Sequence, residues 1–186
     1  MTSFTSKLGD DFLRIPKLAS NGKNWVIYND RLTLSVQACG IGGHLDGTTT
    51  KPTQPAVTQA PASREEKEKI NTYEDDLKEL FQKEAIVSQQ VTSMILDSLY
   101  LKIRGKPTVK EAWDLLKSDF EKRSQIFMVD LRQRLQDERC KDNGNICTHF
   151  DTMHTMRKDL AALGDDLNGK DFSTMLLGSL PRSYDS

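Results

Sequence analysis

Apolar residues recur at every third or fourth position along most of this chain, as they do on one face of an α-helix. The first such run lies between Asn24, a residue type that caps helix starts, and Gly40, a residue type that ends helices. Its apolar members are Trp25, Tyr28, Leu32, Val36 and Cys39. We predict a helix there, and an extended arm over residues 1–23, where Pro16 and Gly22 interrupt any periodicity.

A second helical region begins with a capping box, in which Ser63 and Glu66 satisfy each other's backbone N–H groups. No glycine or proline follows until Gly105, and the apolar stripe consists of Ile70, Tyr73, Leu77, Leu80, Phe81, Val91, Ile95 and Leu99. The stripe weakens between Glu84 and Ser88, and one straight helix of this length would span about 60 Å. We predict two consecutive helices separated at that point, with one bent helix as the alternative.

Residues 42–63 are rich in Thr, Pro and Ala, carry almost no charge and show no periodicity. They predict a long surface loop, although loops of this length are uncommon inside compact domains. Pro52 and Pro55 have the spacing that proline-recognising domains bind. A single pair in a loop of this composition is explained by chance, so we assign it no docking role.

Thr108 and Glu111 form a second capping box directly after Pro107. The helix that follows has a sharp apolar face, made of Val109, Ala112, Trp113, Leu116 and Phe120. We expect Trp113 to lie in a core. Residues 121–124 are short, polar and followed by a new apolar pattern, so we predict the boundary between two lobes there.

Three shorter helices are predicted beyond that boundary. A polar turn at residues 142–145 separates the first from the second, Gly164 ends the second, and Asn168 caps the third. Their apolar residues are Met128, Leu131 and Leu135, then Ile146, Phe150, Met153, Leu160 and Leu163, then Phe172, Met175 and Leu176. No segment alternates with a period of two, so the predicted fold class is all-α.

The charge balance limits the kinds of partner. The chain carries 26 Lys and Arg against 27 Asp and Glu, a formal net charge of −1, whereas nucleic-acid binders need local or overall positive charge. Acidic residues interleave the basic ones, which we interpret as solvated helix faces. The basic positions are Lys102, Arg104, Lys106, Lys122, Arg123, Arg132, Arg134 and Arg139. We expect any RNA contact to come from a local basic patch of this kind or from sequence outside this chain.

The three cysteines, an odd number without disulfide-framework spacing, indicate free thiols in a reducing compartment. The first residues contain no secretory apolar core, and Thr2 occupies the position that myristoylation gives to glycine. No apolar run is long enough to cross a membrane. We therefore expect a cytoplasmic protein that does not associate with membranes.

Cys140, Cys147, His149 and His154 fall within fifteen residues, which raises a zinc hypothesis. Structural zinc sites place their paired cysteines two to four residues apart, whereas six residues separate these two. The two histidines are five positions apart, about 140° around a helix rather than on one face. We predict no metal site.

No other motif supports catalysis or cofactor binding. Asp46 is followed by Gly47 and Thr48, whereas the aspartic-protease signature has the order Asp-Thr/Ser-Gly between strands. The glycines of residues 40–43 lack the preceding strand and the following lysine that phosphate binding requires. A cysteine paired with a histidine lacks a third group to orient it. We predict no catalytic residue, no cofactor and no small-molecule substrate, and hence not an enzyme.

Several motifs follow one another in a fixed order over nearly the whole chain. They are Gly22-Lys-Asn-Trp25, Leu45-Asp-Gly47 and Pro52 with Pro55, then Thr108-Val-Lys-Glu-Ala-Trp113 and Phe120-Glu-Lys-Arg-Ser124, then Leu177-Gly-Ser-Leu-Pro-Arg-Ser-Tyr-Asp185. Together they resemble the Gag polyprotein of copia-type LTR retrotransposons. The chain departs from the family where Tyr73 or Phe81 replaces a tryptophan of the second helix, and it does not contain the zinc knuckle of many relatives.

The resemblance implies two small helical lobes like those of a Gag capsid, an N-terminal lobe over residues 24–121 and a C-terminal lobe over residues 122–186, truncated relative to the family. It implies a structural protein that self-assembles into virus-like particles enclosing element RNA, with the chain itself as main partner. The alternative is a host-adopted Gag remnant acting as an adaptor or a regulator of assembly. An uncovered apolar face on the last helix, residues 172–180, leads us to expect that the second lobe contributes more to self-association.

Overall fold

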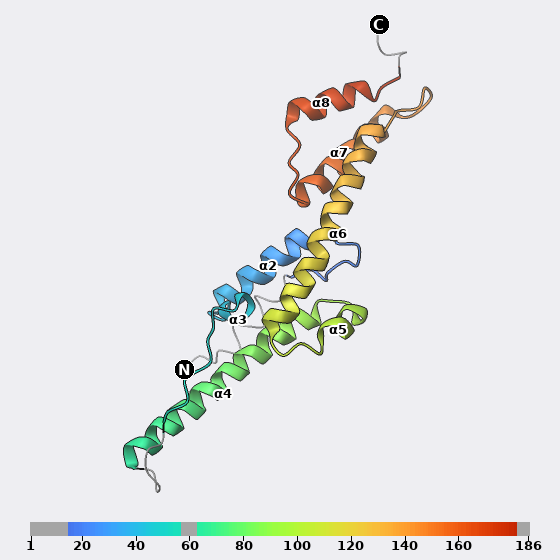
Figure 1. Ribbon diagram of the computed structural model, residues 1–186. Coiled ribbons are helices and arrows are strands. Elements are labelled where there is room, and N and C mark those ends of the chain that lie inside the picture. The colour runs from blue at the N-terminus through green and yellow to red at the C-terminus, as the bar shows by residue number, and fades with distance from the viewer. Residues whose placement is uncertain (1–14, 57–62, 182–186) are drawn as a thin grey trace. The chain divides into compact units, whose positions relative to one another are not determined.

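A computed structural model describes residues 15–56 and 63–181, so most of the arm predicted over residues 1–23 and part of the loop predicted over residues 42–63 lie outside the described residues. The described part forms seven helices and no strand, which confirms the all-α class. The helices are α2 (Trp25–Ala38), α3 (Gly43–Asp46), α4 (Arg64–Ser93), α5 (Asp97–Ile103), α6 (Val109–Asp137), α7 (Ile146–Ala162) and α8 (Gly169–Gly178) (Figure 1). No helix among these residues combines the length and the hydropathy that a membrane crossing requires.

The helices belong to two compact units. Unit 1 contains Arg31–Leu116 together with Ile15, and unit 2 contains Pro16–Asp30 together with the chain from Lys117 onward. Both α2 and α6 pass from one unit into the other, so each unit is built from two stretches of sequence. The division into lobes over residues 24–121 and 122–186 stays a prediction.

The first helix ends where the sequence predicts. Gly40 has φ +70°, and its N–H donates to the carbonyl of Gln37 while the N–H of Ile41 donates to the carbonyl of Val36. This pair of bonds is the Schellman motif, which a left-handed glycine permits. Gly164, with φ +90°, ends α7 by the same pair of bonds.

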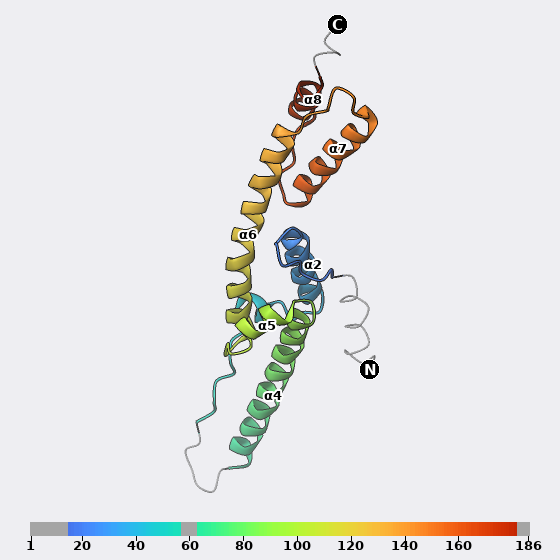
Figure 2. The ribbon, with the colours of Figure 1, turned by 90° about the vertical axis from the view of Figure 1, so that its right-hand side faces the viewer.

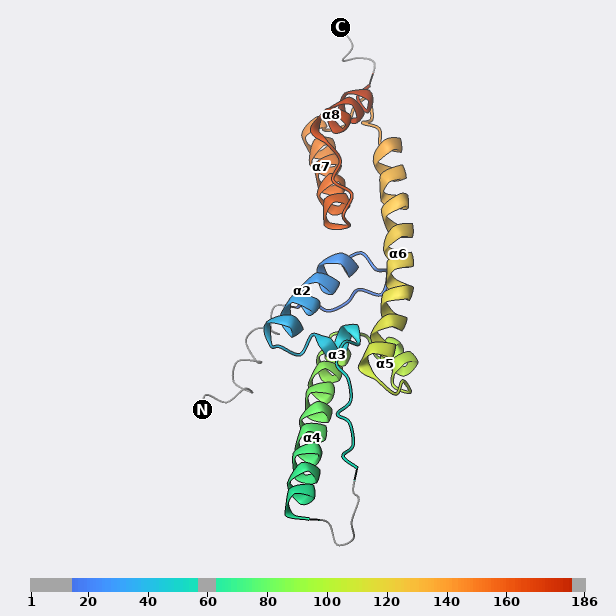
Figure 3. The same cartoon turned by 60° about the vertical axis from the view of Figure 1, so that its left-hand side comes forward.

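The loop predicted over residues 42–63 contains a short helix, α3, that the periodicity did not reveal. Four residues are too few to show a helical period, and two glycines precede its buried His44 and Leu45. The segment after α3 is not helical up to residue 56 and runs back beside α4, with Pro52 and Pro55 near Tyr73 (Figure 3).

The break predicted between Glu84 and Ser88 is wrong, because α4 is continuous from Arg64 to Ser93 and the chain leaves the helix at Met94. Its predicted start is confirmed: the Glu66 N–H donates to the Ser63 hydroxyl at 3.2 Å and the Ser63 N–H donates to the Glu66 carboxylate at 2.8 Å. A second helix, α5, does follow, but it begins at Asp97, beyond the predicted break.

No helix end occurs at residues 121–124 either, since α6 is continuous from Val109 to Asp137. Its start is capped as predicted, with the Glu111 N–H donating to the Thr108 hydroxyl at 3.2 Å. Asp119 and Arg123, one turn apart, form two hydrogen bonds of 3.2 and 2.9 Å that support the helix across the predicted boundary.

The buried residues of unit 1 come from α2, α3, α4, α5 and the first half of α6. Trp113 is buried there, as predicted. The other buried apolar residues of this unit are Ile15, Leu32, Val36, Ile41, Leu45, Val87, Val91, Ile95, Leu99, Ile103, Val109, Ala112 and Leu116.

In unit 2, α7 and α8 pack beside the end of α6 (Figure 2). Their apolar faces form one cluster of Leu131, Leu135, Met153, Met156, Leu160, Leu163, Leu167 and Phe172. Asn145 and Asn168 cap α7 and α8 by accepting hydrogen bonds from the N–H groups of Thr148 and Asp171. The last two of the three helices predicted here are confirmed as α7 and α8, whereas the first is wrong as a separate helix because it is the second half of the continuous α6.

Candidate functional site

Two motif segments that lie about a hundred residues apart in the sequence meet in unit 2. The segment before α2 passes beside α6, close to residues 120–124 (Figure 1). Gly22 has φ +79°, and a Cβ placed on it would stand 3.0 Å from the Cβ of Arg123 and 3.1 Å from the backbone nitrogen of Ser124. Only glycine therefore fits this position without strain or movement of α6.

Arg123 holds the same junction together. One end of its guanidinium group donates to the carbonyl of Ser20 at 2.9 Å, while the remaining N–H groups bind Asp119. The group also lies over the ring of Phe120 at 5.2 Å, and Trp25 stacks on the same ring with centroids 5.5 Å apart. Arg123, which was predicted to lie on a solvated helix face, thus connects α6 with the segment before α2.

Asn24, predicted as a helix cap, uses its side chain differently. Its amide oxygen accepts from the N–H of Ala19 at 2.8 Å, and its amide nitrogen donates to the carbonyl of Lys17 at 2.8 Å. The asparagine therefore fixes the turn that brings Gly22 against α6. The motif Gly-x-Asn-Trp forms a structural joint, and each of its three defining residues has a distinct contact in it.

The four residues of the zinc hypothesis have separate environments. Cys140 and His149 are buried, whereas Cys147 and His154 are exposed, and the ring of His154 lies 4.9 Å from the ring of Phe172. Within the described residues no group of three or more His, Cys, Asp and Glu side chains has a geometry suited to a metal ion.

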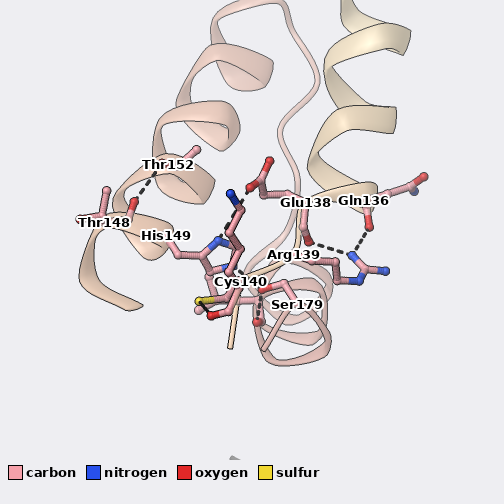
Figure 4. Close-up of polar contacts among 10 residues, drawn as sticks. Gln136, Glu138, Arg139, Cys140, Thr148, His149, Thr152 and Ser179 are labelled. Carbon is pink, nitrogen blue, oxygen red and sulfur yellow. Dashed lines mark hydrogen bonds and ion pairs between the residues drawn. The ribbon is translucent and has the colours of Figure 1, made fainter. Parts of the chain in front are cut away.

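His149 instead binds the motif near the end of the chain. Its Nε2 lies 2.7 Å from the hydroxyl of Ser179, and that hydroxyl donates to the carbonyl of Leu176 at 2.7 Å (Figure 4). Because the serine proton is used there, Nε2–H is the donor to Ser179. The carbonyl of Ser179 accepts from the N–H of Cys140 at 2.8 Å, so this serine joins α8, α7 and the segment between α6 and α7.

Glu138 lies 3.9 Å from the Nδ1 of His149, which gives the order carboxylate, imidazole and hydroxyl that serine nucleophiles use. This order of groups does not make Ser179 a nucleophile. Ser179 is 1% exposed, and its proton points to a carbonyl rather than to the histidine. A histidine that donates to the serine cannot act as its base. The cluster is therefore a structural lock between helices.

A second buried polar cluster, in unit 1, was not predicted. His44 Nδ1 donates to one carboxylate oxygen of Glu84 at 2.8 Å, and the N–H of Val109 donates to the other at 2.7 Å. The His44 side chain is only 4% exposed. Glu84 thus connects α3, α4 and the start of α6, where it satisfies a free N–H of the helix terminus. The sequence signal that could have revealed this cluster is the position of Glu84, a charged residue on the apolar stripe of the helix.

Asp46, considered above for its Asp-Gly-Thr order, stabilises a turn. Hydrogen bonds from the side chain and the backbone of Thr48, at 2.7 and 2.8 Å, lower the pKa of its carboxyl group. The arginines beyond the junction are also engaged: Arg132 binds Asp165 at 2.8 Å, and Arg139 donates to the carbonyls of Gln136 and Glu138. These contacts are structural and reduce the positive charge available to phosphates.

Large apolar side chains are exposed on both units. They are Leu34, Phe81, Tyr100, Leu101 and Leu115 in unit 1, and Ile126, Val129 and Leu177 in unit 2. The uncovered apolar face predicted for α8 is wrong, because Phe172 is buried and Met175 and Leu176 pack against the core cluster, while Leu177, outside that face, is exposed. Single exposed apolar residues are common in soluble proteins, but Ile126 and Val129 lie one turn apart on α6.

Comparison with known proteins places these observations in a family. The family model for the gag-polypeptide of LTR copia-type elements matches residues 34–186, which is most of the chain. Neither the curated proteins nor the solved structures contain a match. The matched family is structural rather than catalytic. The chain belongs to the gag-polypeptide family of copia-type LTR elements.

Proposed function

We propose that this chain is the capsid-forming part of a retrotransposon Gag protein, and that copies of it assemble into particles that enclose element RNA. Family membership supports the proposal. The structural observation that carries it is the presence of exposed apolar side chains on both units, in helices whose ends are fixed by buried polar contacts. A subunit of a closed shell needs more than one contact surface, each held in a defined shape.

The proposed contacts are individually weak. The exposed apolar side chains are single residues or small groups, so each contact buries little apolar area. In a closed shell the same contact is repeated many times, and repetition gives stable particles from weak interfaces. The proposed lobes over residues 24–121 and 122–186 supply separate contacts, and the second lobe supplies the larger share.

We place RNA contact outside this chain. A net charge of −1 gives no general attraction for phosphates. Arg123 and Arg132 are bound to carboxylates, so they contribute little local charge. Assembly of the purified chain is therefore expected to proceed without RNA.

Sedimentation velocity of the full chain across a wide concentration range tests this function. The average mass of the sedimenting species should rise with protein concentration in the absence of RNA. Leu177→Asp, in the second lobe, should weaken association more than Leu34→Asp, in the first, because the second lobe supplies the larger share of the contacts. The two leucines are exposed to similar extents, 67% and 65%, so the two substitutions form a matched pair. An equal effect of the two substitutions would refute the larger share of the second lobe. A chain that stays monomeric at high concentration would contradict assembly and favour the adaptor function.

A further inference from the structure

The middle of α6 presents an apolar pair to solvent on the side away from the core of unit 2. Ile126 is 70% exposed and Val129 is 64% exposed. Phe127 and Met128, between them, pack against the core cluster, and Leu131 and Leu135 belong to it. The apolar pair therefore contributes nothing to the core of its own unit, and it is the most exposed apolar pair on this helix.

The charges around Ile126 are arranged with opposite signs on its two sides. Lys122 lies four residues before Ile126, and Asp130 lies four residues after it, so all three share one side of the helix. Both charged side chains are exposed. Neither forms an ion pair with another described residue, whereas Arg123, beside them, is bound to Asp119.

We infer that this face of α6 binds the same face of α6 in a second copy of the chain, with the two helices antiparallel and Ile126 on the two-fold axis. The inference rests on the proposed function and names one of its contacts. Around such an axis, Lys122 of each copy lies opposite Asp130 of the other, which gives two ion pairs. Asp119 lies opposite Gln133, an amide that can donate to it. The contact is self-complementary, as a two-fold interface requires.

Other arrangements of the same face lack this complementarity. In a parallel pair, Lys122 would lie opposite Lys122 and Asp130 opposite Asp130, which brings like charges together. An antiparallel pair with Ile126 opposite Val129 would set Lys122 against Gln133 and lose both ion pairs. Of these arrangements, only the antiparallel register centred on Ile126 sets the two Ile126 side chains together between two pairs of opposite charges.

The contact is small. Two isoleucines, two valines and the aliphatic stems of two lysines form its apolar part, far below the roughly 1,000 Å² that a specific isolated interface needs. The pair alone is therefore weak, and it becomes effective when the second contacts of each subunit hold neighbouring copies in place. Because its charges are exposed, salt weakens it.

Two charge reversals in the full chain test the inference. Lys122→Glu sets glutamate opposite Asp130 twice, and Asp130→Lys sets lysine opposite Lys122 twice. Each variant alone should associate about tenfold more weakly, since two exposed pairs change from attraction to repulsion. An equimolar mixture of the two variants should recover wild-type association, because each mixed pair again faces opposite charges. The double variant should recover it as well.

Lys158→Glu, an exposed lysine on α7, makes the same change of charge away from this face and is the matched control. A melting curve of each variant tests whether it is folded. Failure of the mixture to recover association, or single variants that associate like the wild type, would overturn this contact while leaving the proposed function intact. A wild-type chain that does not associate at all would overturn both.

Discussion

Gly22 and Arg123 approach each other so closely that a single Cβ on the glycine would stand 3.0 Å from the Cβ of the arginine. The two residues belong to different motifs of the sequence, and their contact fixes the segment before α2 on α6. This contact accounts for two of the polar residues at the predicted boundary, because Arg123 binds the carbonyl of Ser20 and Ser124 is buried against the segment.

Gly22→Ala is expected to lower the free energy of unfolding by more than Gly40→Ala. Both glycines have left-handed φ values, +79° and +70°, which cost a residue with a Cβ about 1–2 kcal/mol. A Cβ at Gly40 meets no atom within 4 Å, whereas one at Gly22 meets the backbone of Ser124 at 3.1 Å. Urea denaturation of the two variants measures the difference, and equal losses would contradict the close approach.

Glu84→Ala is expected to destabilise the protein by about 1–3 kcal/mol, because it leaves the buried His44 ring and the Val109 N–H without their acceptor. Glu79→Ala on the same helix is the matched control, since Glu79 only pairs with Lys83 at the surface. Chemical denaturation compares the two variants. Equal stability of Glu84→Ala and wild type would show that this contact does not hold unit 1 together.

Helix ends were predictable from the sequence because their signals are local. The Ser63 box, the Asn168 cap and the glycines at positions 40 and 164 act through atoms within a few residues. The apolar period also located many buried residues, such as Val91, Trp113 and Leu160, but not the first part of the stripe of α4, where Phe81 is exposed. A helix can be recognised from its own residues when its stripe and caps agree.

Polar residues inside helices were misread because their partners are distant in the sequence. Glu84 interrupts the stripe of α4 to bind His44 and Val109. Arg123 and Ser124 are polar residues on which the segment before α2 packs. In both cases, polar residues that make a tertiary contact were interpreted as the end of a helix. The lock between His149 and Ser179 was also hidden, since thirty residues separate its members.

The bond between His149 and Ser179 is expected to appear as a coupling of about 0.5–1.5 kcal/mol in a double-mutant cycle of His149→Ala and Ser179→Ala. Thermal or urea unfolding of the four proteins measures it. Because the serine hydroxyl is buried and already donates, a fluorophosphonate probe should not label Ser179. Labelling that is lost in Ser179→Ala would contradict the structural role.

Stability is expected to fall as the pH rises above 10.0, the ordinary pKa of tyrosine, because burial raises the pKa of Tyr28 in the folded protein. The unfolded chain loses this proton first, so folding is penalised by up to about 1.4 kcal/mol per pH unit from this residue. Below pH 10.0 the full contribution is present. Denaturation at several alkaline pH values should give a smaller slope for Tyr28→Phe, and identical slopes would contradict the burial.

Assembly is the central claim, and electron microscopy of the purified full chain at high concentration tests it most directly. Copies that bind through repeated weak contacts should form curved or closed particles with a regular subunit spacing, without added RNA, and these should become fewer on dilution. The account predicts such particles. Micrographs that show only single subunits at every protein concentration would contradict the claim of assembly.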